Sequence, residues 1–328
     1  MSTDTTTSDL DVVIPSKDRP DLLTATLAAL NRQSVKRFGV IVVDDGSATE
    51  AEQLVPETLR RALSIRFVRN ETSLGAGPTR NRGVAVSKAD YIVFLDDDCV
   101  AAPELIERHR AALSSAGGPV VSLGPILSPR GVRLPVWTHW DADRLERGYA
   151  SLGRGQTQPG WADLFTGNVG VRRADFLAVG GFDERFPRGE DTELGHRLDE
   201  FGCRFVFDSE AVVWHHSERS LRSWLRIAAD TARFDVEWNR LAPGSDRMSL
   251  VTTQSRDKHW AIRLARKVAR GPVMQDCVIG CAMGAGFLLH ALRIDRAALP
   301  AFSLVRDLVY WQALQEAKSS AAKSKAAA

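Results

Sequence analysis

Three adjacent aspartates, Asp96, Asp97 and Asp98, directly follow the apolar run YIVFL at residues 91–95. Like charges this close repel one another, so one of them should resist ionisation unless a cation lies near. A hard divalent cation prefers oxygen ligands, and Mg2+ or Mn2+ takes one or two carboxylates together with substrate phosphates. The residues therefore indicate a divalent-cation site, with a solvated acidic turn after a strand as the alternative.

Two further segments have the composition of a nucleotide site. In the turn DDGS, Asp44 and Asp45 can accept hydrogen bonds from a base or a ribose, although Asp-Gly is also an ordinary turn signal. The segment Leu74–Asn81 places a glycine-rich loop before a helix, and a helix N-terminus attracts phosphate. Arg80 in this segment can pair with phosphate oxygens. The G-x-G-x-x-G dinucleotide fingerprint is absent, because no glycine stands at the required place.

A pair of acids and a pair of histidines complete the candidate chemistry. Glu190 and Asp191 lie where the segment RGEDTEL opens a helix, so they either stabilise its N-terminus or supply a general base. His215 and His216 end an apolar strand. Because adjacent side chains on a strand point to opposite faces, at most one of these histidines should face a site.

Short β-branched runs and helical patterns alternate in the first part of the chain. We expect strands at residues 11–15, 40–47, 66–69, 91–95 and 120–123, and helices at 20–30, 50–63 and 78–87. This alternation predicts right-handed βαβ units and a mainly parallel sheet. Ligands bind beyond the carboxyl ends of such strands. The segments 15–19, 44–47 and 96–98 are all expected there.

The pattern becomes less regular from about residue 124. Residues 124–160 are rich in glycine, proline, arginine and tryptophan and predict a long loop region, of the kind that often acts as a lid. Further strands are expected at 168–173, 204–208 and 211–214, and helices at 221–241, 258–269, 274–292 and 304–317. We expect residues 1–8 to be disordered and residues 318–328 to form a flexible tail.

The overall composition excludes some classes of protein. Lys+Arg 43 against Asp+Glu 41 gives a net charge of +2 over 328 residues, which argues against a nucleic-acid-binding protein. The four cysteines show neither a zinc pattern nor a disulfide framework, so a reducing cytoplasm is the simplest expectation. The polar, acidic N-terminal segment does not have the apolar core of a signal peptide.

Taken together, the motifs resemble those of the inverting GT-A glycosyltransferases of family 2, over roughly residues 9–216. The resemblance rests on their order: VVIPSKDRP, VVDDGS, LGAGPTRNRG, FLDDD, TGNVGVRR, GGFDERF, GEDTELGHRL and a closing histidine. It implies an α/β GT-A fold with a mainly parallel central sheet flanked by helices. It also implies a GT-A domain at 9–218, with a nucleotide-binding half at 9–100 and an acceptor half at 101–218. A helical C-terminal extension at 219–317 would follow.

The resemblance also implies a role for each candidate residue. The nucleotide would be contacted by Pro15, Arg19, Asp44 or Asp45, and Arg80. The aspartates 96–98 would form the DXD motif: Asp98 would bind Mg2+ or Mn2+ directly, Asp96 would reach the ribose or the metal, and Asp97 would lie on the donor side. His215 would complete the metal shell. Asp191 would be the catalytic base with Glu190 beside it, and Gly167, Asn168 and Trp161 would border the sugar and the acceptor.

The implied reaction is the metal-dependent, inverting transfer of one sugar from a nucleoside-diphosphate sugar to an acceptor hydroxyl. The resemblance favours a UDP-sugar as donor, with a glycan, a lipid-linked saccharide or a natural product as acceptor. The Q-x-x-R-W motif of processive relatives is not matched by the segment LRSWLR at 221–226, which favours single-sugar transfer over polymer synthesis. Two alternatives stay open, a nucleotidyltransferase acting on sugar phosphates and a non-catalytic nucleotide-sugar binding module.

Two C-terminal segments bear on location. Residues 257–270 combine an apolar stripe with five basic residues, which suits either a core-packing helix with a solvated basic face or a helix on an anionic membrane surface. The apolar run Cys277–Leu289 is 13 residues long, against about 20 needed to span a bilayer. We expect it to be a buried helix, with a membrane-surface element as the alternative. The predicted location is cytoplasmic, with peripheral contact at the inner face of the membrane as an open option.

Overall fold

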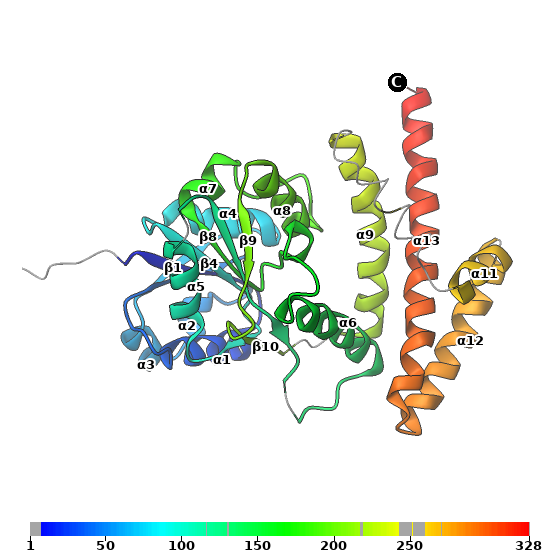
Figure 1. Cartoon of the computed structure of the whole chain (residues 1–328), viewed down its shortest axis with the longest axis horizontal. Helices are drawn as coiled ribbons and strands as arrows, with labels where there is room; N and C mark the ends of the chain where they lie inside the picture. Colours follow the sequence, from blue (N-terminus) through cyan, green and yellow to red (C-terminus); the bar gives the residue numbers. More distant parts are fainter. Residues whose placement is uncertain are drawn as a thin grey trace, which may run out of the picture. The chain divides into compact units, whose positions relative to one another are not determined.

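The computed structural model describes residues 8–115, 117–129, 131–216, 219–242, 251, 260–269 and 271–327 (Figure 1). Residues 1–7 of the predicted disordered N-terminus lie outside this range. The described residues form two compact units. The sheet unit falls within Met1–Gly131 and Leu145–Ser217, and the helical unit within Val132–Arg144 and Glu218–Ala328. The chain thus enters the helical unit once, at residues 132–144, before the sheet unit is complete.

A seven-stranded sheet forms the centre of the sheet unit. Its strands follow the order β3-β2-β1-β4-β8-β6-β9. They are β1 (Leu10–Ser16), β2 (Gly39–Asp44), β3 (Ile65–Arg69), β4 (Tyr91–Leu95), β6 (Val120–Leu123), β8 (Asn168–Arg172) and β9 (Arg204–Phe207). Neighbouring strands are parallel except for β8, which runs antiparallel to both β4 and β6. The predicted mainly parallel sheet is therefore confirmed.

Helices cover both faces of this sheet because its strands are apolar on both sides. In β1, Val12 and Ile14 pack with α1 (Pro20–Asn31) and α5 (Leu105–Ser115), while Val13 joins the opposite cluster. That second cluster includes α4 (Ala76–Val86), α7 (Arg173–Ala178) and α8 (Glu190–Glu200). This alternation along one strand explains the unbroken β-branched runs in the sequence. It also leaves the carboxyl ends of β1, β2 and β4 at a common edge.

A small second sheet lies beside that edge. It has the order β5-β10-β7, with β5 (Cys99–Ala101), β10 (Val213–His215) and β7 (Ile126–Leu127). In the antiparallel pair of β10 and β5, His215 lies opposite Cys99. Because Cys99 directly follows Asp98, this register brings a histidine from far along the chain next to the aspartate segment.

Two expectations for local structure differ from the observed elements. The predicted helix at 50–63 is two short helices, α2 (Ala51–Leu54) and α3 (Glu57–Ala62), because Pro56 interrupts the first and begins the second. The prediction of a loop over 124–160 is wrong, since α6 (Val136–Gly153) occupies half of it, followed by a short helical turn, η1 (Trp161–Asp163). Three of the four prolines that suggested a loop lie before α6, whereas most of the glycines lie within α6 or after it.

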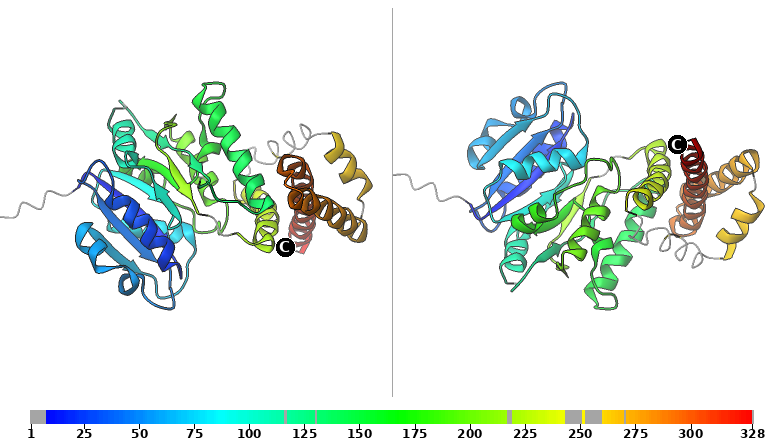
Figure 2. Two further views of the ribbon diagram at one scale, coloured as in Figure 1. Left: turned by 90° about the horizontal axis from the view of Figure 1, so that it is seen from below. Right: turned by 90° about the horizontal axis from the view of Figure 1, so that it is seen from above.

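The helical unit contains α9 (Leu221–Leu241), α11 (Trp260–Val268), α12 (Pro272–Ala291) and α13 (Asp295–Ala327), together with the first part of α6. Helix α13 runs between α9 and α12 and packs against both (Figures 1 and 2). One apolar cluster joins Val136, Trp224 and Phe302. A second joins Ala232 of α9 to Leu314 of α13. Helix α13 begins earlier than the helix expected at 304–317 and continues through the residues expected to form a tail.

The prediction that residues 277–289 are buried is wrong. Within the part of the chain that the structure describes, Val273–Ala291 is the one helical stretch long and apolar enough to cross a membrane, with a mean hydropathy of 1.4. Only 11% of it is buried. Helix α12 packs one side on α13, where Gly286 lies beneath the ring of Phe302, and leaves Leu288 62% exposed on another. Hydropathy alone did not show how many neighbours the helix would have.

Candidate active site

The three adjacent aspartates point in different directions at the end of β4. Asp97 is buried, and its Oδ2 accepts a hydrogen bond from Ser16 Oγ at 2.8 Å. Arg19 Nη1 lies 3.4 Å from its other oxygen. Burial raises the pKa of Asp97 to about 6, and the charge of Asp98 adds to this rise, while the hydrogen bond from Ser16 opposes it. Asp97 thus links the ends of β1 and β4 below the surface.

Asp98 faces the second sheet. Its Oδ1 lies 3.1 Å from His215 Nε2, and its Oδ2 lies 3.1 Å from Arg19 Nη1. Burial alone would raise the pKa of Asp98, but the hydrogen bond with His215 and the charges of His215 and Arg19 lower it below its usual value. Asp98 is therefore held as a carboxylate beside an imidazole nitrogen. Its position depends on the pairing of β10 with β5.

Asp96 faces the opposite way, towards helix α8. Arg80 of α4 donates from Nη2 to Asp96 Oδ1 at 2.5 Å, and its Nη1 lies 3.4 Å from Glu190 Oε1. Burial of the guanidinium alone would lower the pKa of Arg80. The charges of Asp96 and Glu190 outweigh this effect, so the pKa lies above its usual value. One buried cation thus connects the aspartate segment to the acids at the start of α8.

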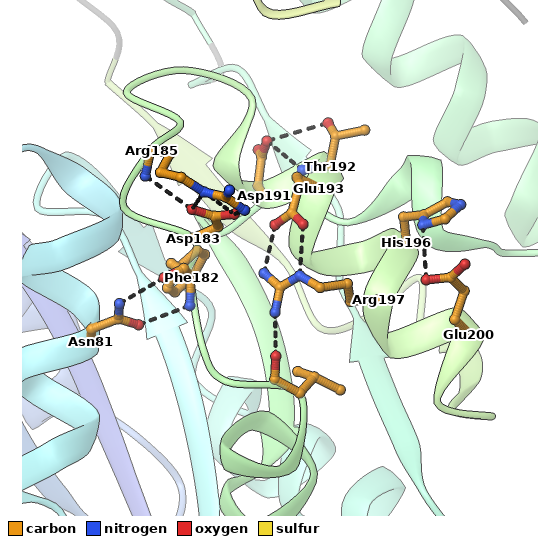
Figure 3. A network of polar contacts seen from close by, with 11 residues as sticks. Asn81, Phe182, Asp183, Arg185, Asp191, Thr192, Glu193, His196, Arg197 and Glu200 are labelled. Carbon is orange, nitrogen blue, oxygen red and sulfur yellow. Dashed lines mark hydrogen bonds and ion pairs between the residues drawn. The ribbon is translucent and has the colours of Figure 1, made fainter. Parts of the chain in front are cut away.

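Asp191 lies in the first turn of α8, after Gly189 in a left-handed conformation (φ 76°). Its Oδ1 accepts a hydrogen bond from the backbone N–H of Thr192 at 2.8 Å (Figure 3). Removal from water and the adjacent charge of Glu190 raise the pKa of Asp191 to about 7, although Thr192 and the charge of Arg80 oppose the rise. A carboxylate with this pKa can gain and lose a proton near neutral pH, as a general base must.

Neighbouring residues hold the start of α8 in place. Asn81, next to Arg80, exchanges two 2.9 Å hydrogen bonds with the backbone of Phe182 (Figure 3). Further along α8, Glu193 receives two hydrogen bonds from Arg197. A Cβ added to Gly77 would lie 3.5 Å from Glu190 Cγ, so α4 and α8 approach closely here. These contacts fix the acids relative to Arg80.

Asp44, the last residue of β2, and Asp45, which follows it, both have several hydrogen-bond partners within the protein. Asp44 accepts hydrogen bonds from the backbone N–H groups of Ser47 and Ala51 and from Arg69 Nη1. The Asp45 carboxylate accepts from Asn70 Nδ2, Ser73 Oγ, Leu74 N, Gly75 N and Thr79 Oγ1. These hydrogen bonds lower the pKa of both groups despite burial. The carboxylates shape the turn and the glycine-rich loop, while their contact with a base stays a prediction.

Gly167 and Asn168 lie next to one another but differ in surroundings. A Cβ on Gly167 would lie 3.1 Å from Asp96 Oδ2, so this position borders the aspartate segment. The Asn168 side chain is buried and donates to the carbonyls of Pro125 and Ala211. Its Oδ1 lies 2.9 Å from His109 Nε2. Its predicted contact with the sugar stays untested, and a structural role is what its hydrogen bonds indicate.

The predicted residues Pro15 and Trp161 lie on different elements. Pro15 is the last but one residue of β1, in register with Val43 of β2. The Trp161 ring makes an edge contact with His196 of α8, with ring centroids 5.4 Å apart. Sequence reasoning missed Ser16 and His109, because an isolated serine or histidine carries no local signal of its partners.

The site carries more negative than positive groups. Five acids, Asp96, Asp97, Asp98, Glu190 and Asp191, surround Arg19 and Arg80. No three His, Cys, Asp or Glu side chains within the described residues are already gathered to hold a metal ion. The pair of Asp98 and His215 nevertheless offers one oxygen and one nitrogen donor, which fits an ion that takes one or two carboxylates and completes its shell with phosphates.

Comparison with known proteins identifies the family. The family model described as "Glycosyl transferase family 2" matches residues 11–180, more than half of the chain. The chain belongs to glycosyl transferase family 2. This family-2 enzyme is a glycosyltransferase, and its mixed sheet with flanking helices is the GT-A fold, so the resemblance stated from the motifs is confirmed.

Its relatives have different named activities. The chain is 28% identical over 219 residues to the amylovoran biosynthesis glycosyltransferase AmsB of Erwinia amylovora, covering 62% of this chain and 68% of that protein. It is 32% identical over 239 residues to the validoxylamine A glucosyltransferase of Streptomyces hygroscopicus subsp. jinggangensis, covering 62% and 54%. For the pre-mycofactocin glycosyltransferase of Mycobacterium tuberculosis the identity is 30%, covering 66% and 44%. The chain therefore spans about half the length of several curated relatives.

Solved structures of low identity share the fold. The mannosyltransferase PcManGT from Pyrobaculum calidifontis, in complex with GDP-Man and Mn2+, has a TM-score of 0.61 at 14% identity, covering 93% of this chain and 86% of that one. Residues 1–349 of TarS from S. aureus, in complex with UDP-GlcNAc, have a TM-score of 0.55 at 15% identity, covering 95% and 92%. At such identities the likeness establishes the architecture of the family-2 enzyme and leaves its substrates open.

Proposed function

We propose that this family-2 enzyme transfers one sugar, with inversion, from a nucleoside-diphosphate sugar to an acceptor hydroxyl in a metal-dependent reaction. The observation that carries the proposal is the arrangement around Arg80, which joins Asp96 on the aspartate segment to Glu190 beside Asp191. The residues that we propose to bind the donor and to act as the general base are thereby connected through one buried cation. We expect a UDP-sugar as donor, and structural neighbours of this chain hold UDP-GlcNAc and GDP-Man.

In the proposed donor complex, Asp98 and His215 would hold Mg2+ or Mn2+, with Asp96 at the ribose or the metal. When bound, the ion neutralises the charge that develops on the diphosphate leaving group. Arg19 has a side chain that is 53% exposed and paired with Asp97 and Asp98, and it would exchange these carboxylates for a phosphate of the donor. Arg80 orients Asp96 and holds Glu190, next to Asp191, close to the aspartate segment. Pro15, Asp45 and Gly167 would line the nucleotide and sugar.

Asp191 would act on the acceptor. Its carboxylate takes the proton of the acceptor hydroxyl as that oxygen attacks the anomeric carbon from the face opposite the diphosphate. The bond between the anomeric carbon and the phosphate oxygen breaks, and its electron pair leaves with the nucleoside diphosphate. One displacement inverts the stereochemistry. The raised pKa of Asp191 matches this role, because a carboxylate with a pKa near the working pH accepts a proton more readily than one near 4.

The acceptor would be a glycan, a lipid-linked saccharide or a natural product, and the enzyme would work in the cytoplasm or at the inner face of the membrane. The variety of the named relatives supports this range, since they include an amylovoran biosynthesis glycosyltransferase and a validoxylamine A glucosyltransferase. Neither a nucleotidyltransferase nor a non-catalytic binding module gains support from the family match.

The direct test is calorimetric binding of UDP, GDP and dTDP, each with and without Mn2+. We expect one nucleotide to bind tightly only with Mn2+, and Asp98→Ala to abolish that dependence. Asp90→Ala is the matched control, because Asp90 is an exposed aspartate just before β4 begins. Equal binding with and without Mn2+ would contradict the metal role of Asp98. Absence of binding by all three nucleotides would contradict the donor assignment.

A further inference from the structure

Helix α12 presents a continuous apolar face to solvent, which we call the outer stripe. Its residues are spaced three or four apart and are all exposed: Val273, Cys277, Cys281, Ala285, Leu288 and Leu292. Val273 is 78% exposed and Leu292 is 60% exposed. Large apolar patches on a protein surface usually mark a contact with a protein or a membrane.

The opposite side of α12 is already occupied by α13. Near the start of α12, Gln275 donates from Nε2 to the carbonyl of Leu308 at 3.2 Å. Near its end, Phe287 packs edge-on against Phe302 with ring centroids 5.4 Å apart. These anchors at both ends fix which side of the helix faces outwards. The outer stripe therefore stays open in the helical unit as the structure describes it.

Basic residues stand at both ends of the outer stripe. Helix α11 carries the exposed Arg263 and Lys267 on the same side as the exposed Leu264 and Val268. Its Arg266 forms a two-hydrogen-bond ion pair with Asp307 of α13, the residue before the one that receives Gln275. Helix α11 is thereby held near the start of α12, as Figure 2 shows.

The far end of the outer stripe has the same character. Arg293, in the turn after α12, and Arg296, in the first turn of α13, are both exposed close to Leu292 and Ile294. Among the described residues from 260 to 296, Asp276 is the one exposed acid, because Asp295 is only partly exposed and pairs with His290. Apolar side chains between clusters of cations are complementary to a surface with anionic headgroups over hydrocarbon.

Self-association explains this charge pattern less well. Consider a two-fold symmetric pair of α12 helices. If the helices are parallel, the start of one lies beside the start of the other; if they are antiparallel, the start of one lies beside the end of the other. Both ends of the outer stripe carry cations, so either arrangement opposes like charges. A bilayer-spanning arrangement is also disfavoured, because α13 is packed along α12 and would carry Arg306 and Asp307 into the hydrocarbon.

We propose that the outer stripe of α12, together with the basic residues of α11 and of the turn after α12, binds the surface of an anionic lipid bilayer. The helix lies in the plane of the bilayer and does not cross it. The inference involves none of the residues of the proposed donor site, so nucleotide binding and bilayer binding can each succeed or fail independently. A membrane-bound catalytic chain would meet acceptors that are themselves held in the bilayer.

The cysteines of the chain provide a direct test. Cys277 and Cys281 lie on the outer stripe and are exposed, whereas Cys99 and Cys203 are buried. In the purified full chain, a water-soluble maleimide should modify the first two and spare the others. Vesicles of phosphatidylcholine mixed with phosphatidylglycerol should slow that modification, and vesicles of phosphatidylcholine alone should not. Equal modification rates with and without the anionic vesicles would overturn the proposal.

Flotation with the same vesicles measures the affinity. The double variant Leu288→Gln/Leu292→Gln should weaken binding by about tenfold or more, since each change removes apolar area from the bilayer. Removing a cation, as in Arg263→Gln or Lys267→Gln, should cost about fivefold each. Leu54→Gln/Leu177→Gln is the matched control, because it alters two exposed leucines of the sheet unit and should bind as the wild type does.

Other outcomes would overturn the inference in distinguishable ways. If Cys277 is protected at high protein concentration without vesicles, and sedimentation shows a dimer that Leu288→Gln/Leu292→Gln abolishes, the outer stripe is an interface between two copies. If bound protein resists extraction at alkaline pH, the helix crosses the bilayer. An unchanged circular dichroism spectrum and an unchanged urea unfolding transition of the variant confirm that the chain has folded in each of these experiments.

Discussion

The carboxyl edge of the sheet unit and the outer stripe of the helical unit differ in whether their side chains have partners within the protein. At the sheet edge nearly every polar group has a partner inside the protein: Asp45 alone accepts five hydrogen bonds, and Arg80 joins two acids. Along α12, apolar side chains such as Leu288 and Leu292 are exposed to solvent. A chemical site must be rigid before its substrate arrives, whereas a docking surface is completed by what it binds.

The largest expected effect concerns Asp191, the proposed base. Asp191→Asn keeps the shape of the side chain but removes its basicity, so turnover should fall roughly 10²–10⁴-fold. The affinity for the nucleotide should stay unchanged in calorimetry, because Asp191 would act on the acceptor. Asp199→Asn, an exposed aspartate on the same helix, should retain full activity. Near-normal turnover by Asp191→Asn would remove this residue from the mechanism.

Replacement of the central cation should reduce stability as well as activity. Arg80→Met would leave Asp96 and Glu190 without their buried partner, and breaking such a pair costs about 3 kcal/mol. Urea unfolding monitored by tryptophan fluorescence would measure the loss. Arg61→Met, which removes an exposed cation paired with Glu57, should change the free energy of unfolding by less than about 1 kcal/mol. Equal effects of the two substitutions would contradict the central role of Arg80.

The pH dependence of turnover should reflect the protonation of Asp191. Because its pKa is raised to about 7, the proton-accepting form is lost as the pH falls through that value. Turnover should reach a plateau above pH 8 and fall to about one tenth of it near pH 6. A profile that stays flat down to pH 5, with donor saturation verified at each pH, would indicate a pKa close to that of an ordinary aspartate.

The smallest expected effect concerns the outer stripe of α12. Leu288→Gln/Leu292→Gln should leave the free energy of unfolding within about 0.5 kcal/mol per substitution, because exposed side chains lose no internal contact. Phe302→Ala, on the α13 surface beneath α12, should cost about 3 kcal/mol or more. If the leucine variant proved as destabilised as the Phe302 variant, the outer stripe would be covered by protein.

Much of the sheet unit follows from the sequence because its signals are local. Strands such as YIVFL are buried on both faces and end at polar residues, so their position and their common edge can be predicted. The direction of β8 could not be predicted, since the residues of a strand do not specify whether its neighbour runs parallel. The pairing of His215 with Asp98 also depends on a register between distant segments. The implied roles of the site residues stay predictions until the donor is bound.

Burial in the helical unit was harder to predict because it depends on which helices pack against one another. The run at 277–289 has the composition of a core helix, and only the position of α13 shows that one side of it is covered. Residues 124–160 suggested a loop because Pro125, Pro129 and Pro135 precede α6, while its three tryptophan and tyrosine positions carry the helical pattern weakly. In contrast, the helix at Leu221–Leu241 was predicted with its observed limits, and the structure shows that the Ser220 side chain caps its N-terminus.

The excursion of residues 132–144 into the helical unit limits how the gene can be shortened or recombined. Val136 and Trp140 complete a cluster with Trp224 of α9 and Phe302 of α13. A chain that ended after residue 218 would still contain Val136 and Trp140 but none of the helices that enclose them. Residues 136–144 therefore depend on the C-terminal helices for their packing, so a recombination event that replaces these helices has to replace the first part of α6 with them.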